Sequence, residues 1–157
     1  MTESERFVGV WELEGIEEIE DIEDGDILEG KRDGGPVRAA PVGFEQPVGL
    51  LIYLASGVMS VNFAGSSRIP FLREFSPSPS ELAAAGAAYG GYAGRWELEE
   101  QAAVVVHMPL VSFVPNRAGA RVRRLYTFEE NLLLLRPIAL APHDDAPNRV
   151  LRWRRRA

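Results

Sequence analysis

The feature that most constrains the fold is a succession of short strand-like segments, separated by short turns along most of the chain. Residues 48–54 and 58–63 form the clearest pair, a hairpin joined by a turn at 55–57. Further strands are expected at 7–16, 95–99, 103–108, 121–128, 132–136 and 149–154, and an acidic alternation continues over 19–26. This spacing of about eight to ten strands favours an all-β antiparallel barrel over a helical or βαβ fold.

The two ends of the chain carry opposite charge. Residues 1–33 hold thirteen acids and three bases, whereas residues 117–157 hold ten arginines and four acids. We expect the arginine-rich tail to face the glutamates of the first strand, where opposite charges contribute about 0.2–1 kcal/mol a pair. Such pairing makes the first and last strands neighbours, as barrel closure requires. A nucleic-acid or membrane patch is disfavoured because the net charge is −6.

Length and composition point to one soluble domain over residues 1–157. A chain of this length buries roughly 68–70% of its unfolded surface, enough for a full core or a barrel with a cavity. It has no cysteine, which suits a reducing compartment. The first six residues are polar, and no segment approaches the roughly 18 apolar residues of a spanning helix. We therefore expect a cytoplasmic protein with no membrane or nucleic-acid partner, and leave its oligomeric state open.

One helix is expected after the central hairpin. Ser78, Pro79 and Glu81 form a capping box with proline at the first helical position, and the alanine-rich run that follows ends at Gly90. The approach to this helix, residues 65–76, carries the apolar side chains Ile69, Phe71, Leu72 and Phe75 without a strand to hold them. We expect loop and helix to form a lid over one barrel mouth, although a loop packed over an open end uses the same residues.

Few residues carry chemistry. The two histidines are His107 and His143, and His143 stands in a loop rich in proline and aspartate where it is expected to be solvated. No carboxylate lies close to His107 in sequence, so no metal site is expected. No catalytic triad or phosphate-binding loop is present, and no cofactor is expected. For His107 we favour a barrel-wall residue with one hydrogen bond over a catalytic base.

Several segments, in order along nearly the whole chain, resemble the lipocalin-like domain family of bacteria and fungi. They begin with Phe7-Val8-Gly9-Val10-Trp11, where a glycine precedes a tryptophan by two residues, and continue at 49–53, 57–61, 92–96, 106–107, 115–116, 122–125 and 150–153. The resemblance implies an up-and-down barrel of the lipocalin type with a mainly apolar cavity. It also implies a setting in secondary metabolism, where some such proteins act as cyclases or isomerases and others only bind.

The sequence departs from the family pattern at two points. His107 is followed by Met108 and Pro109 in place of a second histidine and a carboxylate, and Arg117 stands where a tryptophan usually follows Pro-Asn. These departures weaken any acid–base mechanism taken over from relatives.

Two sets of residues are candidates for the site and its frame. The expected cavity lining is Tyr53, Met59, Val61, Phe63, Phe71, Tyr89, Tyr92, Trp96, His107 and Tyr126. The expected frame is Gly9 and Trp11 with one arginine of the Arg123-Arg124 pair stacked on the indole, Arg124 by preference because it shares a face with Tyr126. The alternation alone leaves open which of these two arginines points inward, and whether His107 lines the cavity.

From these observations we predict that the barrel binds a small hydrophobic molecule, such as a polyketide-like or other secondary metabolite. One alternative is a cofactor-independent cyclase or isomerase that uses the cavity as a conformational template. The other is a structural or interaction module without a ligand.

Overall fold

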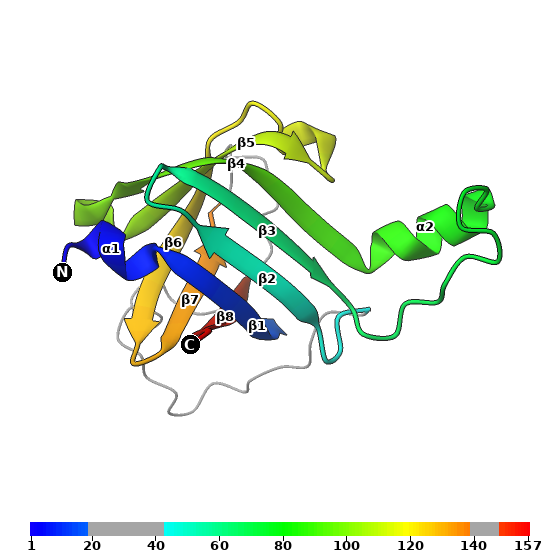
Figure 1. Cartoon of the computed structure of the whole chain (residues 1–157), viewed down its shortest axis with the longest axis horizontal. Coiled ribbons are helices and arrows are strands. Elements are labelled where there is room, and N and C mark those ends of the chain that lie inside the picture. The colour runs from blue at the N-terminus through cyan, green and yellow to red at the C-terminus, as the bar shows by residue number, and fades with distance from the viewer. Residues whose placement is uncertain (19–42, 139–147) are drawn as a thin grey trace.

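Eight antiparallel strands close into one barrel, in chain order, within the part of the protein that the structure describes (Figure 1). The structure is a computed structural model and describes residues 1–18, 43–138 and 148–157. The strands are β1 (Gly9–Glu18), β2 (Val48–Tyr53), β3 (Val58–Ala64), β4 (Tyr89–Glu99), β5 (Val104–Ser112), β6 (Val122–Glu129), β7 (Leu132–Pro137) and β8 (Arg149–Arg155). Each strand pairs with the next, which confirms the predicted up-and-down barrel. The acidic segment 19–26 and His143 lie outside the described residues.

Barrel closure occurs between β1 and β8, as the opposite charges of the chain ends predict. The two strands run antiparallel from Trp11 opposite Arg155 to Glu18 opposite Arg149, with an irregularity between Leu13 and Gly15. Four ion pairs lie on the outer face where β1 and β8 meet: Arg152–Glu17 at 2.9 Å, Arg152–Glu14 at 3.8 Å, Arg154–Glu14 at 2.8 Å and Arg156–Glu12 at 2.8 Å. Such partly exposed pairs contribute modestly to stability, but they favour this register over its neighbours.

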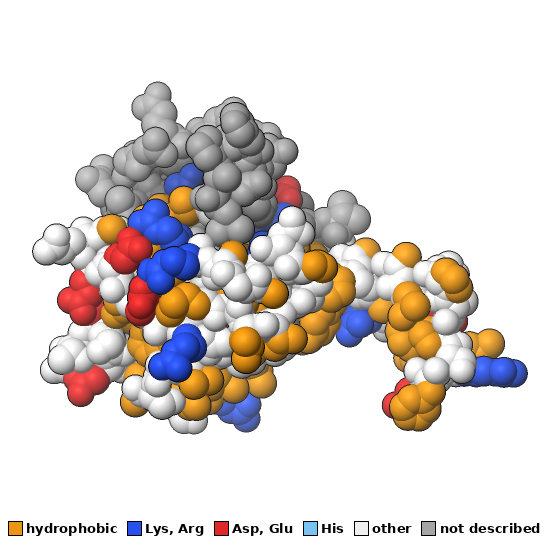
Figure 2. Space-filling view, turned by 90° about the horizontal axis from the view of Figure 1, so that it is seen from above, with side chains coloured by type: hydrophobic (Ala, Val, Ile, Leu, Met, Phe, Trp, Pro, Cys, Tyr) orange, Lys and Arg blue, Asp and Glu red, His pale blue; other side chains and the backbone are white. Residues whose placement is uncertain are grey.

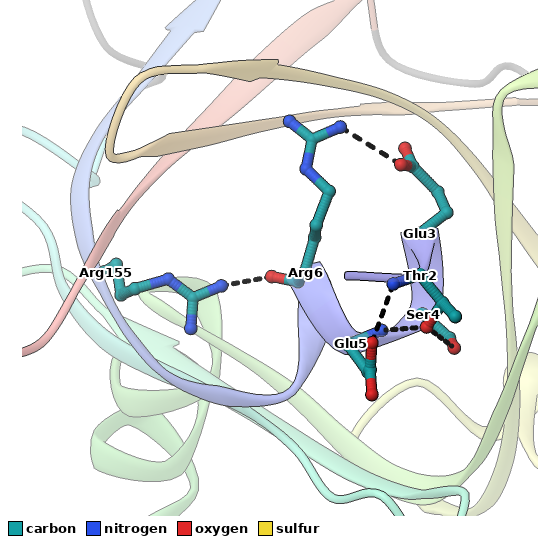
Figure 3. A network of polar contacts seen from close by, with 6 residues as sticks. All are labelled: Thr2, Glu3, Ser4, Glu5, Arg6 and Arg155. Carbon is teal, nitrogen blue, oxygen red and sulfur yellow. Dashed lines mark hydrogen bonds and ion pairs between the residues drawn. The ribbon is translucent and has the colours of Figure 1, made fainter.

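A short helix that is not predicted, α1 (Glu3–Phe7), closes one end of the barrel (Figure 1). The first strand therefore begins at Gly9, and its predicted start at Phe7 is wrong. Thr2 and Glu5 form its capping box, with the Glu5 backbone N–H donating to Thr2 Oγ1 and the Thr2 N–H donating to the Glu5 carboxylate (Figure 3). Phe7 at the helix end is fully buried. The indole N–H of Trp11 donates to the Phe7 carbonyl at 2.8 Å, which ties the helix to β1.

The arginine that lies over the Trp11 indole is Arg155, 4.2 Å from the ring centroid, and the predicted stacking of Arg124 is wrong. Arg155 also donates to the carbonyls of Val8, at 2.9 Å, and of Arg6, the latter contact being visible in Figure 3. Gly9 is required beside it because its φ is +138° and an added Cβ would lie 2.9 Å from Arg155 Nη1. An arginine does stack on Trp11 as predicted, but it belongs to β8 and not to β6.

The predicted helix is present as α2 (Pro79–Ala87), with Ser78 as the cap and Pro79 in its first turn. It buries none of its side chains, and Figure 1 shows it extending away from the barrel. Leu72 and Phe75 in the preceding loop are each 91% exposed. Figure 2 shows apolar side chains gathered on this projecting segment. The predicted lid over the barrel mouth is therefore wrong: capping signals locate the helix, but not the surface on which it rests.

Candidate functional site

The barrel interior has two halves that differ in how they are filled. Next to α1, the rings of Phe7, Tyr53, Trp96, Tyr126 and Phe128 pack against one another with centroids 4.8–5.9 Å apart. In the other half a cavity of about 70 Å³ remains between the side chains. The closed end is thus a packed aromatic core, and the space for another molecule lies toward the opposite end.

The strand alternation places two kinds of side chain around this cavity. Its apolar part comes from several strands and consists of Ile16, Leu51, Val61, Phe63, Leu135, Pro137, Leu151 and Trp153. Its polar groups are Tyr92, His107, Arg117, Arg124 and Arg149. A mostly apolar concavity with a few polar groups is the usual character of a small-molecule site.

His107 on β5 is held between two tyrosines. Tyr53 Oη lies 2.6 Å from His107 Nε2, and Tyr92 Oη lies 2.6 Å from His107 Nδ1. All three side chains are buried. In a neutral imidazole one nitrogen donates and the other accepts, so one tyrosine accepts the ring N–H and the other donates its O–H. Both ring nitrogens are therefore occupied by protein partners.

Burial controls the protonation of this group. It holds the pKa of His107 well below its ordinary value of 6.5, and the nearby positive charge of Arg124 lowers that pKa further. Burial also raises the pKa of Tyr53 well above 10.0, with a further contribution from Tyr92. Both shifts favour the neutral forms of His107 and Tyr53, so these two side chains supply hydrogen bonds without a charge.

The charge in the cavity comes from three arginines on different elements. Arg117 lies on the 3₁₀ helix η2 (Pro115–Arg117), Arg124 on β6 and Arg149 on β8. Arg124 is only 9% exposed and donates from Nη1 to the carbonyl of Arg123 at 3.1 Å. The guanidinium of Arg117 lies 6.0 Å from the centre of the Tyr92 ring. No acidic side chain is among the described residues that line the cavity.

The structure separates the ten predicted lining residues into three groups. Val61, Phe63, Tyr92 and His107 line the cavity. Tyr53, Met59, Trp96 and Tyr126 belong to the buried core outside it, although Tyr53 reaches His107. Phe71 is half-buried in the segment before α2, and Tyr89 lies at the start of β4, where its Oη donates to Asn62.

Several lining residues are absent from the sequence-based list. Leu135 belongs to an unbroken run of four leucines, which has no alternation to show which side chains point inward. Arg117 stands in a short Pro-Asn-Arg segment that the sequence analysis treats as a loop. Its departure from the family pattern at that position is the one signal that singles it out.

A wider groove opens beside the cavity, where β1 stops pairing with β2. These strands pair only from Gly9 opposite Tyr53 to Glu12 opposite Leu50. The groove has a volume of about 510 Å³, and its apolar lining includes Leu13, Val48 and Phe63. Phe63 lines both the groove and the cavity, and its ring lies 5.6 Å from that of Phe44. The Phe63 side chain therefore forms part of the boundary between the two spaces.

Within residues 1–18, 43–138 and 148–157, no three histidine, cysteine or carboxylate side chains are grouped as metal ligands would be. In the same residues, no helix has the length and apolar character needed to cross a lipid bilayer.

A closed antiparallel barrel with an internal, mainly apolar cavity defines the class of small barrels that hold small molecules inside them. Comparison with known protein families agrees with this class. Residues 8–156 match the lipocalin-like domain family, and the chain belongs to that family. No match was found among curated proteins or among solved structures.

Proposed function

We propose that the barrel binds a small, mainly hydrophobic molecule at the end opposite α1. The observation that carries this proposal is the cavity itself: polar groups from β4, β5 and β6 border a space that no side chain of the described residues fills. A barrel serving only as a structural module is expected to fill its interior on both sides, as the half next to α1 is filled. A polyketide-like or other secondary metabolite is the proposed type of ligand, on the basis of the family resemblance.

The volumes indicate how such a ligand would lie. A cavity of about 70 Å³ is small beside the roughly 300–1,000 Å³ of sites that enclose drug-sized molecules. The neighbouring groove of about 510 Å³ has the larger capacity. We propose that one end of the ligand enters the cavity while its body occupies the groove, with Phe63 turning aside.

The Phe63 ring lies over a glycine of the neighbouring strand. The residue opposite it on β4 is Gly90, where an added Cβ would lie 2.6 Å from Phe63 Cζ. The ring therefore rests on a position that only glycine leaves open.

A cyclase or isomerase is the second candidate, and the geometry limits how it would work. His107 has a depressed pKa and hydrogen bonds to tyrosines at both ring nitrogens, so it has no free position for proton abstraction. Catalysis in this cavity would have to rest on confinement of a flexible substrate. Binding without turnover requires no such additional effect, and we place it first.

A dye titration tests the proposed function. Nile red, a neutral dye whose emission rises in apolar surroundings, is titrated into the wild type, Val61→Phe and Val58→Phe. Val61 lines the cavity, whereas Val58 on the same strand is 43% exposed. We expect saturable binding to the wild type and Val58→Phe, and at least about tenfold weaker binding to Val61→Phe, whose larger side chain fills the cavity. Equal affinity in both variants, each shown to be folded by circular dichroism, would contradict the proposal.

A further inference from the structure

We propose that the ligand carries a carboxylate, which binds in the cavity to Arg124 and Arg117 beside Tyr92, while its apolar part extends past Phe63 toward the groove. This inference deepens the proposed function and rests on it. It adds a chemical class that a barrel with an apolar cavity does not by itself imply.

The charged side chains that line the cavity are positive. Arg117, Arg124 and Arg149 border it, and none of the described lining residues is acidic. Burial keeps His107 and Tyr53 neutral, so neither carries a charge that offsets the arginines. Burial lowers the pKa of Arg117, and the charges of Arg124 and Arg149 lower it further, which shows that these cations affect one another. A bound anion would reverse this repulsion.

Arg124 and Arg149 have few hydrogen-bond acceptors among the described residues. Arg124 is 9% exposed, and the structure gives its guanidinium one acceptor among the described residues, the Arg123 carbonyl. Arg149 Nε is buried with no hydrogen-bond partner there, and the nearest pairing of Arg149 is with Glu18 at 3.9 Å. A guanidinium offers five N–H donors, and burying it without acceptors is unfavourable. Carboxylate oxygens placed between these arginines would supply acceptors that the described residues do not.

The chemistry of the lining favours a carboxylate on an apolar body. Arginine binds carboxylate through two parallel N–H donors, and Tyr92, whose ring centre lies 6.0 Å from the Arg117 guanidinium, also lines the cavity. The remaining lining is mainly apolar and includes Val61, Leu135 and Trp153. A singly charged head with an alkyl or aryl body matches both kinds of lining residue, and the small cavity volume matches a compact head.

Three probes with one alkyl chain test the inference: decanoate, 1-decanol and decyl phosphate. Their dissociation constants are measured by calorimetry at pH 7.5 for the wild type, Arg124→Met, Arg117→Met and Arg123→Met. Arg123→Met is the matched control, because Arg123 pairs on the outer face with Glu99 at 2.6 Å and does not line the cavity. The two cavity variants are measured separately, so that a folding defect in one leaves the other as a test.

We expect wild-type protein to bind decanoate at least about tenfold more tightly than 1-decanol. Arg124→Met or Arg117→Met should remove most of this preference and leave 1-decanol affinity within about twofold, and Arg123→Met should keep it. Equal binding of decanoate and 1-decanol would overturn the inference and leave the proposed function standing. Tighter binding of decyl phosphate, or a preference that survives both cavity variants, would overturn it as well. If neither decanoate nor 1-decanol binds, the proposed function fails with it.

Discussion

Replacing Arg155 by alanine should destabilise the fold without touching the cavity. Its guanidinium lies 4.2 Å from the centre of the Trp11 ring and donates to the carbonyls of Val8 and Arg6. These three contacts join the end of β8 to β1 and to α1 at the closed end of the barrel. Because α1 carries the fully buried Phe7, loosening this corner exposes the aromatic core as well.

The expected cost follows from these contacts. A cation over an indole contributes about 0.5–2 kcal/mol, and hydrogen bonds to a charged group about 1.5–3 kcal/mol each, with incomplete additivity. We therefore expect Arg155→Ala to lower the free energy of unfolding by about 3 kcal/mol, which corresponds to a fall in Tm of about 6–12 °C for a chain of this size. Arg155→Lys keeps the charge but not the fork of donors, and should lose about half as much.

Urea denaturation followed by tryptophan fluorescence measures this effect, with Arg154→Ala as the control. Arg154 is the next residue, but its side chain is 53% exposed and pairs with Glu14 at 2.8 Å on the outer face. Its loss should cost about 0.2–1 kcal/mol. If the two alanine variants lose the same stability within about 0.5 kcal/mol, the assignment of Arg155 as the residue that closes the barrel is wrong.

Three further predictions concern Phe7, His107 and Leu82. Phe7→Ala should cost about 3–5 kcal/mol in urea denaturation, because Phe7 is fully buried among the rings of the closed end. The depressed pKa of His107 means that the unfolded chain binds a proton that the folded chain does not. Stability should therefore fall as pH is lowered below about 6.5, by at most about 1.4 kcal/mol per pH unit from this group, and His107→Gln should flatten that part of a Tm–pH profile. Leu82→Ser should change Tm by less than about 2 °C, because Leu82 on the projecting α2 is 54% exposed.

Much of the fold is predictable from the sequence because a half-buried strand leaves a pattern with a period of two. Met59, Val61 and Phe63 alternate with polar residues, and they are the inward-facing residues of β3. The closure of β1 on β8 is likewise readable, since only neighbouring strands bring the two oppositely charged ends of the chain together.

The two helices show where such local information ends. The capping box of Ser78 and Glu81 predicts α2, but a cap has no bearing on what the helix packs against, and α2 extends away from the barrel. The equivalent pattern of Thr2 and Glu5 precedes a helix of only five residues. A helix that short is not stable alone, so its presence depends on the burial of Phe7, which the sequence does not display.

The candidate site is less predictable than the fold because it depends on register between distant strands. Arg124 and Arg155 both occupy inward-facing positions of their strands, and alternation treats them alike. Which of them meets Trp11 depends on the pairing of β1 with β8, where Trp11 lies opposite Arg155. That register includes an irregularity between Leu13 and Gly15, which shifts every later pair and has no clear signal in the sequence.

The two inward-facing arginines of β8 show why the ends of this barrel differ in role. Arg155 stacks on the Trp11 ring and donates to the carbonyls of Val8 and Arg6, so the protein itself supplies its acceptors. Arg149, six residues earlier on the same face, has a buried Nε without a partner among the described residues and a carboxylate no nearer than 3.9 Å. Residue type, strand and face are the same, but the acceptors among the described residues differ. Where they engage the guanidinium, the arginine joins β8 to β1 and α1; where Nε has no partner among them, the arginine supports the proposed binding of an anion.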